Sequence, residues 1–538
     1  MRVRADVLAA VAGLMLAALR MPVAVAAEEP ANVLLFTIDS CRADRFGVYG
    51  NPQSPTPRID AWAQSGTVFS RAYSTSAWTV PGLVSALSGL HPPTHGINNR
   101  DRMGSPELLS LTKIFRRKGY LTPNLNFFSF APYYTNLGLG EIERRYFGQQ
   151  EGDELLNWLK EYSAQAPFFL WYHTTIVHQP YNPGEANLPR PAEELAQRPG
   201  IRAVMKGAIV PLGSAQFQEG DGPILKALYD AEMGRMDQLF GKAQELLREK
   251  GLLAKTLIVL TADHGEELLD HGFVGHASTS LHAKLYEEFL HIPLMVSWPG
   301  KVPQGKTDDR LASQIDILPT ILNLMGIEVP EYVQGSDLLK EPPQRSLYFE
   351  SVIAGNQTTK EREHLWLRAV RQGDWKYISN GELYRLDQDP QEKNDLAQKF
   401  PHKVQELQAD LAAWLQESAQ AGKRIFPTEP QVHTSVRPGA CPVIHTPGNG
   451  QTLSYDVHTG SLLFDWSGDL GTHYRLAYDI GQGDHHVAGV YEVQGNHQLM
   501  GPMPRELWTN LKAWNPFRIR VSPKSDPPCW SEWVTFRF

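Results

Sequence analysis

Predominantly apolar runs alternate with amphipathic stretches between about residues 31 and 330. The runs cover residues 32–39, 167–173, 256–263 and 292–296. Strands of this composition need cover on both faces, so the pattern predicts a doubly wound α/β sheet. Ligands of such sheets bind beyond the carboxyl ends of the strands. Because the first three runs end in Asp39, His173 and Asp263, we expect these side chains at one edge of the sheet.

The pattern changes twice toward the C-terminus. Short strands at 375–378 and 383–386 and an amphipathic helix at about 403–417 predict a small α+β subdomain. Alternating segments at 462–466, 474–478 and 517–521, separated by Gly and Pro turns, predict a β-sandwich. The expected domains are therefore 28–340, 341–425 and 430–538. Residues 180–223 read as a long loop over the edge where ligands would bind.

The first 27 residues have the layout of a signal peptide. Arg2 and Arg4 precede an apolar run at 7–19, and small residues at 24–27 suggest a cleavage point. The run is too short to cross roughly 30 Å of hydrocarbon, although an uncleaved anchor is the alternative. We expect a periplasmic or secreted protein with no membrane span after cleavage. Among the three cysteines, Cys441 and Cys529 are expected to pair, which leaves Cys41 alone.

Composition and charge narrow the class of protein. The 538 residues are 42% hydrophobic and 20% charged, with a formal net charge of −8, as in ordinary globular proteins. A chain of this length is expected to fold into two or three units. The mildly acidic balance argues against a nucleic-acid partner.

The segment Asp263-His264-Gly265-Glu266 directly follows an apolar run and offers mixed metal donors. A carboxylate beside an imidazole favours zinc or manganese over calcium, which prefers oxygen ligands alone. Asp39 would supply a third donor from the end of the first strand. Taken singly, each residue could equally be a helix cap or a hydrogen-bonded core histidine. Their common position at strand ends favours a metal site.

Residues 76–89 read as a loop that enters a helix, with Thr79 as N-cap and Pro81 in the first turn. The N-terminus of a helix stabilises anions through free N–H groups and its dipole. A threonine hydroxyl at this place that also touched a divalent metal could ionise and attack phosphorus. The simpler interpretation is that Thr79 only caps the helix.

Ordered motifs across residues 31–420 resemble the sulfatase family of the alkaline phosphatase superfamily. They lie at 32–50, 56–60, 79–81, 87–89, 93–96, 173–181, 263–266, 276, 282–287, 293, 316–320, 383–384 and 389–390. The resemblance implies an enzyme that hydrolyses phosphate or sulfate esters with one or two divalent metal ions. Its metal ligands would fall on Asp39, Thr79, Asp263, His264 and His276. The residues that bind or convert the substrate would be Thr79, His178, His282 and Lys284.

One departure from the family pattern affects the expected chemistry. Sulfatases modify the Cys or Ser of a Cys/Ser-x-Pro/Ala-x-Arg motif to formylglycine, but the aligned positions here are Thr79 and Leu83. Thr79 more closely resembles the phosphodiesterase, phosphonate hydrolase and phosphoethanolamine or phosphoglycerol transferase branches, where the hydroxyl itself is the nucleophile. Residues 41–45 match the modification motif by letter, yet they come about 40 residues too early in the chain.

Several functions stay open from the sequence. The leading hypothesis is a phosphate-ester hydrolase with Thr79 as nucleophile. The alternatives are sulfate-ester hydrolysis without formylglycine, group transfer, and a non-catalytic protein that binds a glycan or another partner. The expected substrates are small-molecule, glycan or lipid-headgroup esters.

Overall fold

A computed structural model describes residues 31–98, 104–280, 282, 284–340, 345–352 and 366–426. Towards the C-terminus it describes 444–446, 462–466, 473–482, 485–494, 497–500, 517–523 and 530–536. The expected signal peptide and the expected Cys441–Cys529 pair lie outside these ranges. Across the ranges that are described, no helix has the length and apolar character needed to cross a membrane.

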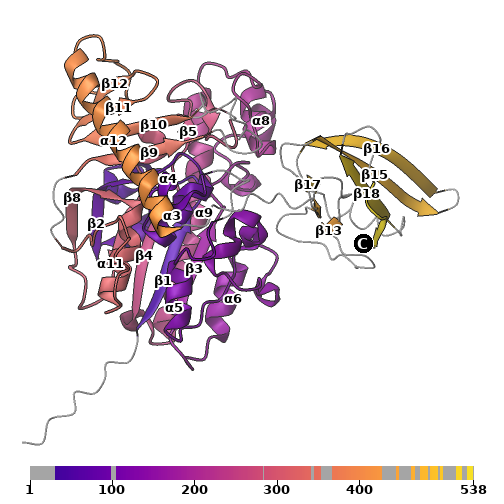
Figure 1. Cartoon of the computed structure of the whole chain (residues 1–538), viewed down its shortest axis with the longest axis horizontal. Helices are drawn as coiled ribbons and strands as arrows, with labels where there is room; N and C mark the ends of the chain where they lie inside the picture. The colour runs from indigo at the N-terminus through magenta and orange to yellow at the C-terminus, as the bar shows by residue number, and fades with distance from the viewer. Residues whose placement is uncertain are drawn as a thin grey trace, which may run out of the picture. The chain divides into compact units, whose positions relative to one another are not determined.

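A six-stranded sheet forms the centre of the N-terminal part (Figure 1). Its spatial order is β3 (Phe169–Thr174), β1 (Asn32–Ile38), β4 (Thr256–Ala262), β7 (Leu294–Ser297), β2 (Thr67–Tyr73) and β8 (Lys306–Ser313). β1 runs parallel to β3 and β4, whereas β7 is antiparallel to both β4 and β2. The sheet is therefore mixed, and the fold is the α/β class that the apolar runs predict.

Helices cover both faces of this sheet. Leu34, Phe36 and Ile38 of β1 belong to a buried cluster with residues of α2 (Pro57–Ala63), α6 (Asp153–Glu161) and α9 (Asp221–Glu249). On the other face Phe115 of α5 (Leu111–Arg117) stacks on Phe169 of β3. The remaining helices of this part are α3 (Thr79–Ser88), α4 (Pro92–His95), α7 (Ala192–Ala196), α8 (Pro199–Lys206), α10 (Glu287–Leu290) and α11 (Ile317–Leu324).

A second, antiparallel sheet follows the first. It contains β12 (Leu383–Arg385), β11 (Trp375–Ile378), β10 (Leu367–Gln372) and β9 (Leu347–Ser351) in that order. The long helix α12 (Pro401–Ile425) packs Leu407, Leu411 and Trp414 against Val370 and Tyr377 of this sheet. The helix is longer than the predicted 403–417 because its apolar face continues to Ala421.

Further strands near the C-terminus form two antiparallel sheets. One consists of β13 (Ile444–Thr446), β14 (Leu462–Trp466) and β17 (His497–Met500). The other consists of β16 (His485–Gln494), β15 (His473–Gln482), β18 (Phe517–Pro523) and β19 (Val534–Phe536). The alternation of apolar and polar residues therefore predicted strands correctly here.

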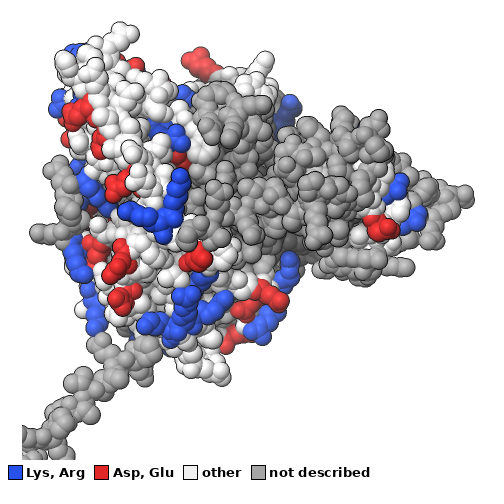
Figure 2. Space-filling view, viewed as in Figure 1, with Lys and Arg blue, Asp and Glu red and all other residues white. Residues whose placement is uncertain are grey.

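Residues 180–223 contain more regular structure than the predicted long loop. They contain a 3-10 turn at Glu185–Asn187, the short helices α7 and α8, and the start of α9. Ile201 and Val204 of α8 are buried in the cluster beneath the segment, so this part is folded onto the core. On the face that Figure 2 shows, acidic and basic side chains are interspersed.

Candidate active site

Two carboxylates and an imidazole meet at the carboxyl ends of the parallel strands. Ile38 is level with Thr174 of β3 and Ala262 of β4, so Asp39 and Asp263 leave their strands side by side. The ligand atoms of Asp39, Asp263 and His264 all lie within 4.8 Å of one another. His264 Nε2 is 3.4 Å from Asp263 Oδ2 and 3.7 Å from Asp39 Oδ1. The edge of the sheet that the sequence singled out is therefore where these donors converge.

Backbone contacts orient His264 for metal binding. Its Nδ1 lies 2.7 Å from the Gly265 carbonyl oxygen, and because a carbonyl can only accept, Nδ1 carries the proton. The lone pair of Nε2 then faces the two carboxylates. Metal-bound histidines usually donate their other ring N–H in this way. Burial lowers the pKa of His264, which favours the neutral form that a metal requires.

Ser40 holds both carboxylates in place. Its N–H donates to Asp263 Oδ1 at 3.0 Å, and its hydroxyl donates to Asp39 Oδ1 at 2.9 Å. Ser40 adopts a positive φ of 58°, a conformation that costs energy for a residue with a side chain. The strained turn thus lets one residue bond to two ligands. The sequence did not single out Ser40, although its place directly after Asp39 is a signal for such a role.

The carboxylate pair has the electrostatic character of a site for a divalent cation. Asp263 Oδ2 is buried and has no hydrogen-bond partner among the described residues. Burial and the nearby Asp39 carboxylate raise the pKa of Asp263 well above its usual range. Two buried carboxylates repel each other unless a proton or a cation lies between them. Two oxygen donors and one nitrogen donor fit zinc or manganese.

Thr79 lies beside this group. Its Oγ1 is 3.3 Å from His264 Nε2, and its backbone begins helix α3. The N-cap is Trp78, so the prediction of Thr79 as N-cap was wrong by one residue. Among the described residues, the hydrogen-bond contact of Thr79 Oγ1 is with His264 and not with a backbone N–H of the helix. Because the hydroxyl does not cap the helix, it remains available for chemistry. The alternative that Thr79 only caps a helix is not supported.

Gly82 allows α3 to approach the strand end closely. A Cβ atom at this position would lie 2.4 Å from the Asp263 carbonyl oxygen. The same oxygen accepts hydrogen bonds from Ser74 Oγ at 2.6 Å and Gln314 Nε2 at 2.7 Å. The helix that carries Thr79 therefore packs directly against the backbone of Asp263.

His173, which the sequence placed at a strand end without a firm role, joins the carboxylates. Its Nε2 lies 3.4 Å from Asp39 Oδ2 and 3.9 Å from Asp263 Oδ2. His173 Nδ1 lies 2.9 Å from Thr37 Oγ1. Because this hydroxyl donates its proton to the Tyr172 carbonyl, it accepts a hydrogen bond from Nδ1. His173 therefore presents Nε2 to the site. It is a fourth nitrogen or oxygen donor on the same edge.

His276 and His178 form the side of the site next to His264. The ring centroid of His276 lies 4.4 Å from that of His264 and 5.1 Å from that of His178. His276 Nδ1 is 3.0 Å from Glu266 Oε1, and its Nε2 is 2.8 Å from Ser278 Oγ. His276 thus lies beside the metal donors but outside the converging group. Glu266, the last residue of the Asp-His-Gly-Glu motif, was not assigned a role by the sequence.

Glu266 is fully buried, and its carboxyl group has a raised pKa. Burial raises the pKa of its carboxyl group to about 8, although His178 and His264 oppose the shift. Tyr181 donates to its other oxygen at 3.2 Å. The Glu266 carboxyl group therefore contacts His276 and Tyr181 from within the core.

His282 and Lys284 lie farther along the same segment. His282 packs edge-on against Phe273 with ring centroids 5.4 Å apart. Lys284 Nζ is 3.4 Å from the Tyr286 hydroxyl and lies over the Tyr286 ring. In the part of the chain that is described, neither contacts the Asp39 group. The structure thus brings together six of the eight predicted site residues.

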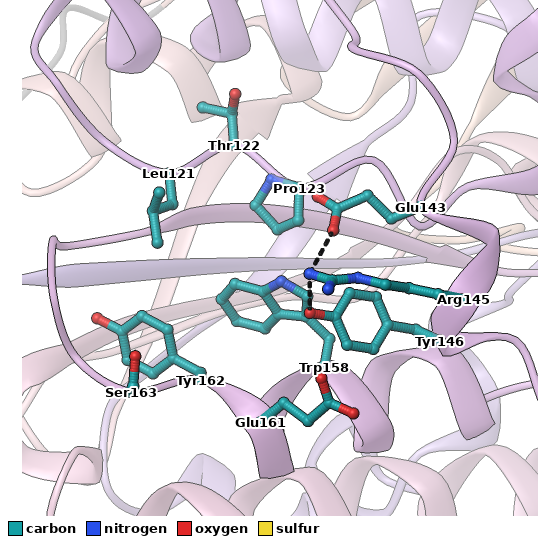
Figure 3. A pocket seen from close by; sticks show the side chains of 10 residues that line it. All are labelled: Leu121, Thr122, Pro123, Glu143, Arg145, Tyr146, Trp158, Glu161, Tyr162 and Ser163. Atoms are coloured by element: carbon teal, nitrogen blue, oxygen red, sulfur yellow. Dashed lines mark hydrogen bonds and ion pairs between the residues drawn. The ribbon is translucent and has the colours of Figure 1, made fainter.

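A cavity of about 390 Å³ lies at the opposite end of β3 from these residues (Figure 3). Leu121 on its rim is bridged to Phe168, which precedes the strand, whereas His173 lies near the strand's end. Arg145 extends across the Tyr146 ring, donates to its hydroxyl at 2.6 Å and pairs with Glu143 (Figure 3). This cavity does not belong to the candidate active site.

Comparisons with known proteins identify the family. The sulfatase family model matches residues 31–327, and the model of the N-sulphoglucosamine sulphohydrolase C-terminal region matches residues 282–421. The first match covers more than half of the chain. The chain therefore belongs to the sulfatase family and is a hydrolase that acts on ester bonds.

Individual relatives agree with this assignment. Arylsulfatase K of Bos taurus is 24% identical over 450 residues, covering 71% of this chain and 81% of that protein. N-acetylglucosamine-6-O-sulfatase of Bacteroides thetaiotaomicron is 21% identical over 501 residues, covering 74% and 88%. Among solved structures, the phosphonate monoester hydrolase of Agrobacterium radiobacter superposes with a TM-score of 0.57 at 20% identity, covering 73% of this chain and 96% of that one. That likeness shows the fold.

Proposed function

We propose that this chain hydrolyses phosphate mono- or diesters of a small molecule or glycan, with the Thr79 hydroxyl as nucleophile. The observation that carries the proposal is the 3.3 Å separation between Thr79 Oγ1 and His264 Nε2, whose lone pair faces Asp39 and Asp263. A nucleophilic oxygen thus lies beside donors suited to a cation. We also propose export of the chain, because residues 1–27 have the layout of a signal peptide.

Asp39, Asp263 and His264, with Thr79, would hold one zinc or manganese ion, and a second ion is compatible with the histidines nearby. When bound, such an ion supplies positive charge that lowers the pKa of a contacting hydroxyl. The Thr79 oxygen releases its proton to solvent and forms a bond to phosphorus while the bond to the leaving oxygen breaks. Water then attacks phosphorus, phosphate departs, and the Thr79 oxygen regains a proton.

Groups of this chain stabilise the charge that the reaction moves. Free N–H groups in the first turn of α3 and the helix dipole favour the anionic phosphoryl group. His178 or His276 protonates the leaving alkoxide, since both rings lie beside the metal donors. Lys284 and His282 remain candidates for contact with a substrate oxygen.

Replacement of Thr79 tests the proposal. We expect Thr79→Ala to lose about 10³-fold or more of kcat on 4-nitrophenyl phosphate, because the nucleophile is removed. Thr79→Ser keeps a hydroxyl and should retain measurable turnover. Thr94→Ala is the matched control, since this threonine of α4 is buried and its hydroxyl donates to the Ser418 carbonyl, away from the site. Wild-type rates in the Thr79→Ala protein would refute a nucleophilic role.

Sulfate-ester hydrolysis is the second candidate, and the names of two curated relatives favour it. Arylsulfatase K and N-acetylglucosamine-6-O-sulfatase are both named as sulfatases. Rates on paired 4-nitrophenyl phosphate and 4-nitrophenyl sulfate separate the two candidates. A quenched reaction analysed by intact-mass spectrometry should show one phosphoryl group on wild type and none on Thr79→Ala. A higher rate on the sulfate would reverse the preference.

A further inference from the structure

A second cluster of metal-binding side chains lies apart from the Asp39 group. Glu267 begins the hairpin of β5 (Glu267–Leu268) and β6 (Val274–Gly275), His271 lies in the turn of this hairpin, and Glu288 belongs to α10. The ligand atoms of these three residues all lie within 4.8 Å of one another. We propose that Glu267, His271 and Glu288 form a second site for a divalent cation of the zinc class.

The distances match those between ligands of one small cation. His271 Nδ1 is 3.3 Å from Glu267 Oε2 and 3.6 Å from Glu288 Oε2. Ligands about 2.0–2.1 Å from a tetrahedral zinc ion are separated from one another by roughly 3.3–3.4 Å. The His271 ring stacks on Tyr286 with centroids 4.0 Å apart, and this contact fixes the direction of its nitrogens. Two carboxylates and one imidazole are donors that zinc accepts, with a fourth position left for water.

Polar atoms in this cluster lack hydrogen-bond partners. Glu288 is 8% exposed, and its Oε2, which faces His271, has no hydrogen-bond partner among the described residues. Glu267 is 0% exposed, and its two oxygens contact the backbone N–H and the ring of His271. Leaving a buried carboxylate oxygen without a donor is costly, and a bound cation removes that cost.

Nearby basic side chains are engaged by other groups. Arg42 pairs with Asp44 at 2.8 Å, pairs with Asp270, and donates to the Glu266 carbonyl. Lys393 donates to the Asp270 carbonyl. In the described part of the chain neither Arg42 nor Lys393 forms an ion pair with Glu267 or Glu288, so the positive charge beside these carboxylates comes from His271 or from a bound cation. A cavity of about 440 Å³ is lined by Glu288 and Asp270 and so borders the cluster.

The new site would hold the segment that carries Asp263 and His264 against α10. Gly265 N–H donates to the Phe289 carbonyl at 2.7 Å, and Glu266 N–H donates to the Glu288 carbonyl at 2.9 Å. A cation shared by Glu267 and Glu288 adds a third connection between the same two pieces of chain. The inference depends on this geometry alone and is independent of the chemistry proposed for Thr79.

Zinc content of the full-length protein tests the inference. Wild type, Glu288→Gln and Asp263→Asn are dialysed against the same low zinc concentration, and bound zinc per chain is measured by elemental mass spectrometry. We expect Glu288→Gln to bind one zinc fewer than wild type, because an amide is a much weaker ligand than a carboxylate. Glu232→Gln is the control, since Glu232 is a buried carboxylate that pairs with Arg235 outside the cluster.

Equal zinc content in wild type and Glu288→Gln would overturn the inference, because the cluster would then be an ion pair of protonated His271. The Asp263→Asn protein gives a second measurement that leaves the cluster unchanged. We expect the Asp263→Asn protein to lose activity but still bind zinc at the cluster. The double variant Asp263→Asn, Glu288→Gln should lose this remaining zinc. If Asp263→Asn alone binds no zinc, the second site does not exist. Failure of the Thr79 mechanism would leave these zinc contents unaltered, so the two proposals fail separately.

Discussion

Replacement of Gly82 by alanine should damage both stability and catalysis, although alanine is normally the better residue in a helix. The new Cβ would lie 2.4 Å from the Asp263 carbonyl oxygen, whereas ordinary contacts begin at 3.4 Å, so the backbones must separate by about 1.0 Å. Overpacking of this kind costs about 1–3 kcal/mol. The carbonyl also accepts from Ser74 and Gln314, and weakening each bond costs up to about 1 kcal/mol. Alanine has a helix propensity about 1 kcal/mol more favourable than glycine, so the terms together give a net loss centred on about 2 kcal/mol.

The catalytic effect follows from the same displacement. A shift of about 1 Å between Thr79 and the Asp263 carboxylate should lower kcat/KM about 10²-fold. Urea denaturation followed by circular dichroism measures stability, and hydrolysis of 4-nitrophenyl phosphate measures activity. Gly234→Ala is the matched control, because this mid-helix glycine of α9 would place its Cβ 3.7 Å from the nearest atom and should gain up to about 1 kcal/mol. If Gly82→Ala were as active and as stable as Gly234→Ala, the close approach of α3 would not position the site.

Two further predictions concern buried charge. Lys376 is fully buried and lies 3.1 Å from Glu287 and 2.9 Å from Glu392, so Lys376→Ala should lower the free energy of unfolding by about 3–5 kcal/mol in urea denaturation; an unchanged urea midpoint would contradict this. Burial opposes ionisation of Asp270, but Arg42 and Lys226 together more than offset it and lower the Asp270 pKa from 3.8 to about 2. Ionised Asp270 therefore adds about 2 kcal/mol to the free energy of unfolding above pH 4, and this contribution is lost as the pH falls towards 2. The stability gap between wild type and Asp270→Asn should narrow over that interval, and a constant gap would refute the assignment.

Strands with uniform apolar character were predictable, and so was the edge where they end. The runs at 32–39 and 256–263 are predominantly apolar and each ends in an aspartate, so both the burial of these strands and the place where they end could be predicted from the sequence. The strands β2 and β8 were not predicted from the sequence. β8 is the outermost strand of the sheet, and its residues Lys306 to Arg310 are largely polar and exposed, so an apolar pattern is absent.

Contacts between distant segments explain what the sequence missed at the site. His173 was visible as a polar strand end, but only the parallel pairing of β1 with β3 brings its Nε2 to Asp39. His271 and Glu288 are separated along the chain and meet only because the β5–β6 hairpin folds onto α10. No local pattern encodes such a meeting, since periodicity describes one element at a time.

The frame of the active site depends little on the side chain at position 79. A Cβ atom at Gly82 would lie 2.4 Å from the nearest carbonyl oxygen, and one at Gly265 would lie 2.0 Å from such an oxygen. Ser40 adopts a positive φ and thereby bonds to both carboxylates. These constraints fix the helix start and the metal donors through backbone geometry. Thr79 is partly buried, and among the described residues its hydroxyl makes one hydrogen-bond contact, at 3.3 Å with His264 Nε2. The backbone geometry of the site therefore allows a different side chain at position 79 without rebuilding the fold around it.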